Sequence, residues 1–113
     1  MAVYVGDLFM RLGGVAYYSP QFERGGLAVT MLFNIFALSA TSIVVTLEHK
    51  NIEDTTWSTL ATATYTTTGL QAPLTSSPTV VKEVLRIKYV VNGAADELAV
   101  YMNTLAPVWQ PYP

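Results

Sequence analysis

The sequence has no cysteine, a single histidine and few charged residues. Lys, Arg, Asp and Glu make up 12% of the 113 residues, about half of the roughly 25% that is usual in soluble domains. Without cysteine the chain has neither disulfides nor thiolate metal ligands. The net charge is −2 and the basic residues are scattered, so we expect no nucleic-acid partner.

Apolar residues are abundant instead, at 51% of the chain. A domain of this length leaves many of them at its surface, where other subunits can cover them. The composition therefore favours a homo-oligomer or larger assembly over a free monomer. The charge-free stretch 25–47 is interrupted by Thr, Ser and Asn. It predicts strands rather than a membrane helix, and we expect no membrane partner.

Alternating apolar residues and regularly spaced turn residues predict an all-β fold. Asn92-Gly93 is a strong hairpin signal, although the residues after it lengthen the loop. The main strands are expected at 27–38, 42–49, 57–67, 79–91 and 97–105.

We expect a single domain over residues 1–113, an antiparallel β-sandwich or jelly-roll-like fold with about six to eight strands. Residues 1–26 are rich in turn formers and predict an irregular arm, in which Ala2 to Val5 and Val15 to Tyr18 could form short strands and Asp7 to Leu12 one helical turn. Residues 27–105 hold the strands. Residues 106–113 contain three prolines, which predict an extended tail without regular structure because proline cannot donate a backbone hydrogen bond.

The strand predicted at 27–38 is apolar on both faces. Leu32 and Phe36 lie on the face opposite to its inward residues, so this strand is either central in a two-layer core or covered by a partner subunit. The predicted inward residues are Val29, Met31, Phe33 and Ile35 here, Ile43, Val45 and Leu47 in the next strand, and Val81, Leu85, Ile87, Tyr89 and Val91 in the fourth.

The two ends of the chain also carry large side chains without a core of their own. Val108, Trp109 and Tyr112 lie in the proline-rich tail, and aromatic side chains on an extended segment are good anchors for a neighbouring surface. Tyr17 and Tyr18 lie in the predicted arm. We therefore predict protein contacts at Tyr17, Tyr18, Leu32, Phe36, Val108, Trp109 and Tyr112.

The stretch VTLEHKNIEDTTWSTLAT, residues 45–62, holds the only histidine. No framed nucleophile accompanies His49, so the sequence predicts no catalytic triad. Glu48 and His49 are adjacent and point to opposite faces of a strand, while Glu53 and Asp54 match no calcium loop. We interpret the stretch as a strand, an acidic loop and another strand, and expect no enzyme activity, cofactor or metal site.

The aromatic residues leave a second hypothesis open. Trp57 with a neighbouring tyrosine either stacks on sugars or closes one end of the sandwich. A carbohydrate-binding β-sandwich module is therefore the alternative function. Trp57 and a tyrosine exposed side by side would favour it.

The segments SIVVTLEHKNIEDTTWSTLATAT, VVKEVLRIKYVV and VYMNTLAPVWQPY resemble the small all-β decoration, or cement, proteins of tailed-phage heads. The resemblance covers residues 42–112 and rests on strand pattern and composition. It implies a non-enzymatic subunit, a trimer in preference to a dimer, that binds the major capsid protein at the capsid surface of the virion. A subunit of a virion tail or a secreted filament is the alternative within the structural class.

Overall fold

The computed structural model describes residues 6–10, 16–77, 79–93 and 99–111, with no side-chain description for residues 6–10 and 99. These residues contain strands and no helix, which confirms the all-β prediction. Seven strands have four or more residues, and the others are shorter. The strands are β1 (Gly6–Met10), β2 (Ala16–Tyr18), β3 (Phe22–Glu23), β4 (Ala28–Met31), β5 (Phe33–Ser39), β6 (Ser42–Lys50), β7 (Ser58–Tyr65), β8 (Gly69–Leu70), β9 (Leu74–Thr75), β10 (Val84–Asn92), β11 (Ala99–Thr104) and β12 (Val108–Gln110).

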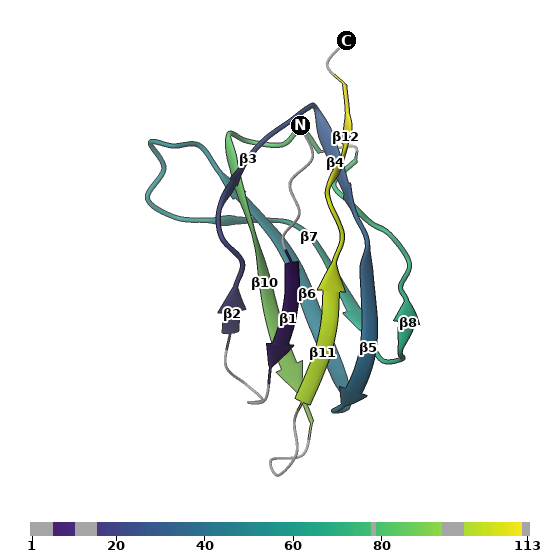
Figure 1. The fold of residues 1–113 in the computed structure, drawn as a ribbon. Helices are drawn as coiled ribbons and strands as arrows, with labels where there is room; N and C mark the ends of the chain where they lie inside the picture. The colour runs from purple at the N-terminus through teal and green to yellow at the C-terminus, as the bar shows by residue number, and fades with distance from the viewer. Residues whose placement is uncertain (1–5, 11–15, 78, 94–98, 112–113) are drawn as a thin grey trace.

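The strands form two layers of antiparallel sheet (Figure 1). The first layer has the order β1-β11-β5-β8, and it is extended by the small sheet β12-β4-β9. The two parts of this layer join where Leu105 N–H donates to the Leu32 carbonyl, at 3.0 Å. The second layer has the order β2-β10-β6-β7, with β3 also paired to β10.

The core lies between the two layers, and the predicted inward residues of 27–38, 42–49 and 79–91 are all buried there. The Phe33 ring lies against the rings of Tyr65 and Tyr89, with centroids 5.9 and 6.5 Å apart. The Tyr89 hydroxyl also shares a buried hydrogen bond of 2.7 Å with Thr104 Oγ1. Burial raises the pKa of Tyr89 from its ordinary value of 10.0 to about 12, so this hydroxyl keeps its proton at alkaline as well as at neutral pH.

The first strong segment, 27–38, is two strands rather than one. Leu32 separates β4 from β5, which belong to the two successive sheets of the first layer. Within β5 the register against β11 shifts: Ala37 pairs with Tyr101 and Ile35 pairs with Met102, which leaves Phe36 as an extra residue. This β-bulge turns Leu38 toward the core although Phe33 and Ile35 also face inward.

The described residues among the first 26 form short strands in both layers rather than an irregular arm, and the strand predicted at Val15 to Tyr18 is present as β2 over Ala16–Tyr18. The helical turn predicted at Asp7 to Leu12 is wrong where the structure describes it, because Gly6–Met10 forms β1 and pairs with β11. Strands β2 and β3 pair with β10. Phe22 on β3 is buried in the core. The arm residues that the structure describes are therefore edge strands of the sandwich.

The tail 106–113 also contains regular structure. Val108–Gln110 forms β12 at the edge of the small sheet and pairs with β4. Pro107 and Pro111 flank this strand, where a missing backbone N–H leaves no gap in the ladder. Residues 112–113, which include the predicted contact Tyr112, lie outside the described residues.

Asn92-Gly93 does not close a hairpin. The strands on either side of it, β10 and β11, lie in different layers. The turn at Ser39–Ser42 likewise leads from β5 in the first layer to β6 in the second, and Thr41 N–H donates to the Asn92 carbonyl at 2.9 Å. The described part of the chain has no helix long and apolar enough to cross a membrane.

Candidate interaction surfaces

The outer face of the first layer carries an exposed aromatic pair. Phe36 is 51% exposed and Tyr101 is 40% exposed, and their ring centroids lie 5.3 Å apart. The bulge holds Phe36 on this face opposite β11, so the two rings contact each other across the strands. The fold thus presents two aromatic rings together to the outside.

Leu70 on β8 extends this surface. It pairs with Asn34, whose side chain lies on the same face of β5 as that of Phe36, and it is 65% exposed. Strands β5, β8 and β11 contain no charged residue at all. We call Phe36, Leu70 and Tyr101 the apolar face.

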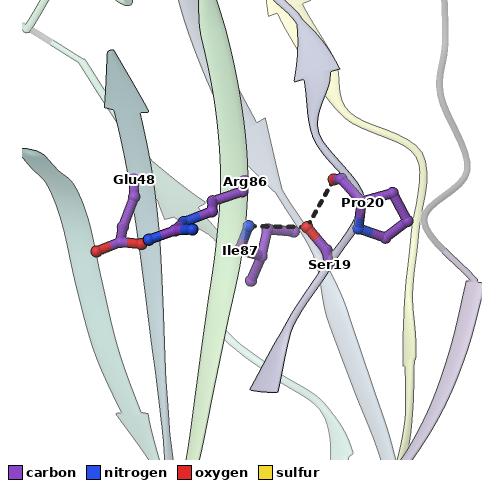
Figure 2. A network of polar contacts seen from close by, with 5 residues as sticks. All are labelled: Ser19, Pro20, Glu48, Arg86 and Ile87. Atoms are coloured by element: carbon purple, nitrogen blue, oxygen red, sulfur yellow. Dashed lines mark hydrogen bonds and ion pairs between the residues drawn. The ribbon is translucent and has the colours of Figure 1, made fainter. Parts of the chain in front are cut away.

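The outer face of the second layer is built around Arg86 on β10. Its guanidinium carbon lies 4.1 Å from the centroid of Tyr18 on β2 and 4.4 Å from that of Trp57, which precedes β7. Its Nε–H donates to Glu48 Oε1 on β6 at 2.8 Å (Figure 2). Contacts with two rings and a carboxylate fix the orientation of this side chain, since each is attractive for a guanidinium.

Tyr18 is held beside Arg86 by the link between β2 and β3. Ser19 N–H donates to the Ile87 carbonyl at 2.8 Å, and Ile87 N–H donates to Ser19 Oγ, also at 2.8 Å. The Ser19 hydroxyl donates to the Pro20 carbonyl at 3.0 Å (Figure 2). These bonds replace the ladder where the chain turns at Ser19-Pro20, so the edge of the sheet stays attached to β10.

Lys88 adds a second cation to this face. It pairs across the sheet with Tyr18 on one side and Thr46 on the other, neither of which is acidic. We call Tyr18, Trp57, Arg86 and Lys88 the cationic face. Glu48 is the one carboxylate on the strands that form it, so cations are in excess there.

The loop between β6 and β7 projects from the sandwich at the upper left of Figure 1. Ile52, at its tip, is 71% exposed. The tip is nevertheless held by hydrogen bonds: Asn51 N–H donates to Asp54 Oδ2 at 2.9 Å, and Ile52 N–H donates to Glu83 Oε1 at 3.1 Å. Lys50 Nζ donates to the Asp54 carbonyl at 3.1 Å. An open hollow of about 270 Å³ lies beside it, lined by Glu23, Arg24, Ile52, Glu83 and Val84.

His49 is buried at the end of β6 and does not line that hollow. Its Nδ1 accepts the Lys82 backbone N–H at 3.1 Å, so this nitrogen carries no proton and is not available as a base. Burial, and then the nearby Lys82 ammonium, lower the pKa of His49 below its ordinary value of 6.5. The ring therefore has a structural role as a neutral acceptor.

This role predicts that acid destabilises the fold through His49. Because the folded pKa is depressed, the stability from the neutral ring is fully present above pH 6.5 and is lost as the pH falls through the folded value. Acidification should cost the wild-type protein on the order of 1 kcal/mol, the usual net contribution of one hydrogen bond. Urea unfolding at neutral and at mildly acidic pH measures this loss.

The matched variant for that measurement is His49→Asn, whose side-chain oxygen can accept the Lys82 N–H without titrating. Its stability should change much less over the same pH range. An equal loss in both proteins would assign the pH dependence to other groups.

The structure places the predicted contact residues in different environments. Tyr18 and Phe36 are exposed, as is Val108 on β12, whereas Leu32 is half-buried at the break between β4 and β5. Tyr17 packs against the core. Contacts at the exposed residues stay a prediction.

Trp109 packs within its own chain. Its ring meets that of Phe22 edge-on, with centroids 6.5 Å apart, and it lies directly over Gly25. Trp109 therefore has a structural role at the end of the core of its own chain. The proline-rich sequence around it did not indicate this contact.

Sequence reasoning missed Tyr101 and Leu70 as members of the apolar face. The signal for Tyr101 was present, because Val100 and Met102 are inward residues and the residue between them on a strand must face outward. No similar signal marked Leu70, since the two-residue strand β8 lies in a segment that reads as a long turn.

The sugar-stacking hypothesis depends on whether Trp57 and a tyrosine are exposed side by side. The Trp57 ring is half-buried and has two cations against it, Arg86 at 4.4 Å and Lys50 at 5.2 Å from its centroid.

Among the described residues, no group of three or more His, Cys, Asp or Glu side chains could hold a metal ion. Comparison with protein families, curated proteins and solved structures finds no match to this chain.

Proposed function

We propose that this chain is a non-enzymatic structural subunit that associates with copies of itself through the apolar face. The observation that carries the proposal is the exposed Phe36–Tyr101 pair on strands without a charged residue. Among the described strands of four or more residues, the first layer has a charged residue only on its edge strand β1. All the other charged residues of these strands lie on β6 or β10, in the second layer. Such a division of charge suits a sandwich with one surface made to be covered.

The magnitudes indicate a modest contact that gains strength by repetition. Burial of a large apolar side chain contributes about 1.5–3 kcal/mol, while association of two proteins costs roughly 4–15 kcal/mol in lost freedom. Three side chains per copy therefore give a weak pairwise contact. Many symmetry-related contacts in one assembly add up to a stable whole, because each further contact forms at high effective concentration.

Within the structural class, we propose a capsid decoration protein at the surface of a virion, as a homo-oligomer, with a trimer favoured, bound to the major capsid protein. The support is the resemblance of residues 42–112 together with the low charge and the all-β fold. A subunit of a virion tail or of a filament would use the same apolar face.

Phe36→Ser tests the self-association. This substitution removes one ring of the exposed pair without touching the core, and the self-association should weaken by about tenfold or more if Phe36 is a central contact. Sedimentation velocity over a concentration series gives the mass of wild type and variant. Val80→Ser is the matched control, because Val80 is equally exposed but lies outside the apolar face. The proposal fails if both variants associate like wild type.

A further inference from the structure

The tip of the β6–β7 loop differs from an ordinary solvated loop in its exposed apolar side chain and its hydrogen-bonded backbone. It presents Ile52, an apolar side chain, at 71% exposure, followed by the exposed carboxylate of Glu53. Its backbone is fixed by the hydrogen bonds to Asp54 and Glu83. A rigid segment binds with little further loss of conformational entropy, so an exposed apolar residue on a fixed backbone is a preformed contact.

The cationic face has the complementary chemistry. Tyr18 is 49% exposed and offers an aromatic surface for an apolar side chain. Arg86 and Lys88 follow each other on the same side of β10, with Glu48 as their acidic neighbour. This face therefore offers an aromatic surface to an apolar side chain and cations to a carboxylate that follows it in sequence.

We propose that the tip residues Ile52 and Glu53 of one copy dock on the cationic face of a second copy. Ile52 packs on Tyr18, and Glu53 lies by Lys88 and the edge of the Arg86 guanidinium. The end of the molecule around the tip carries the carboxylates of Glu23, Glu53, Asp54 and Glu83 against the cations Arg24, Lys50 and Lys82. This acidic excess faces the cationic excess of the other copy, which favours the encounter.

The contact differs in kind from the one at the apolar face. A tip that docks on a different surface of the next copy forms a heterologous contact, which closes into a ring or continues as a chain. The apolar face and the cationic face lie on opposite layers, so one copy can use both. This inference rests on the proposed function only in so far as both make the chain an assembly subunit.

The test is a pair of charge reversals made in the Phe36→Ser background, where the contact at the apolar face is weakened. Glu53→Lys places a cation against the cationic face, and Lys88→Glu places a carboxylate against the acidic tip. Each should weaken the remaining association by about tenfold or more, since like charges in contact oppose binding. Thr66→Lys, a charge change at an exposed residue between β7 and β8, is the control and should have no effect.

Mixing the two reversed proteins gives the sharpest result. In the mixture the basic tip of the Glu53→Lys protein meets the acidic face of the Lys88→Glu protein. The unchanged tip of the Lys88→Glu protein meets the unchanged face of the Glu53→Lys protein, so both contacts have opposite charges again. Sedimentation should show association restored in the mixture and weakened by about tenfold or more in either protein alone. Raising the ionic strength from roughly 0.05 to 0.5 M should weaken it, because salt screens exposed charges.

The proposal is overturned if either reversed protein associates as strongly as its Phe36→Ser parent, or if the mixture stays dissociated. Loss of association with Lys88→Glu but not with Glu53→Lys would assign the cationic face to a different acidic segment and also overturn the docking of this tip. These outcomes are independent of the apolar face, whose own test compares wild type with Phe36→Ser.

Discussion

Phe33→Ala should destabilise the protein by about 3–5 kcal/mol, the usual cost of removing a buried phenylalanine ring. Phe33 has no exposed surface and contacts the rings of Tyr65 and Tyr89. It also lies next to the buried Tyr89–Thr104 hydrogen bond that links the two layers. The truncation leaves a cavity at the centre of the sandwich that the flanking sheets cannot fill.

Phe36→Ala is the matched control for that substitution. It removes the same ring from the same strand, three residues further on, but on the solvent side. Its cost in unfolding free energy should be below about 1 kcal/mol, as for other exposed positions. Urea unfolding of both variants at low protein concentration measures the difference. Similar losses of unfolding free energy in the two variants would contradict the burial of Phe33 and the exposure of Phe36.

Gly26→Ala should cost about 3 kcal/mol, at the upper end of the range for overpacking. A Cβ at Gly26 would lie 2.3 Å from the backbone oxygen of Gln110. That oxygen cannot move freely, because it accepts the Leu27 N–H at 2.8 Å and belongs to β12, which pairs with β4. We therefore expect the pairing of β12 to open in this variant.

Gly25→Ala separates this effect from an ordinary loss of glycine. There a Cβ would lie 2.8 Å from Nε1 of Trp109, and a side chain can turn away where a backbone cannot. The expected cost is about 1 kcal/mol. Thermal unfolding and protection of the β12 amides from hydrogen exchange distinguish the two variants. Equal stability and equal protection would contradict the close approach of β12 to Gly26.

The parts of the fold that the sequence predicted well are the long strands with one buried face. In β6 and β10 every second residue is apolar and inward over most of the strand, so the two-residue period identifies both strands and their orientation. The break at Leu32 and the bulge at Phe36 have no such signature, because they depend on which strands pair with β4 and β5. Alternation alone cannot show that a strand leaves one sheet and enters another.

Short strands escaped the sequence prediction for a related reason. β3 and β8 are two residues long each and pair with β10 and β5, which are distant from them in sequence. A period cannot be read over so few residues, and the glycines and prolines around them indicate turns. The Asn92-Gly93 signal failed because a tight turn makes a hairpin only when both strands remain in one sheet, and here they separate into different layers.

The candidate surfaces were predicted only in part. The apolar character of Phe36 and the absence of charge around it were visible in the sequence. The arrangement of Arg86 between Tyr18 and Trp57 was not, because it joins three segments that come together only through the order β2-β10-β6-β7. The sequence around His49 carries no catalytic pattern, but only the structure reveals its bond to the Lys82 amide.

The most direct test of the central proposal is the mass of the wild-type protein in solution, measured by light scattering across a dilution series. We expect a species of at least twice the 12.3 kDa of one chain at micromolar concentration, and a lower mass for Phe36→Ser. A wild-type protein with the mass of one chain at every concentration would contradict it.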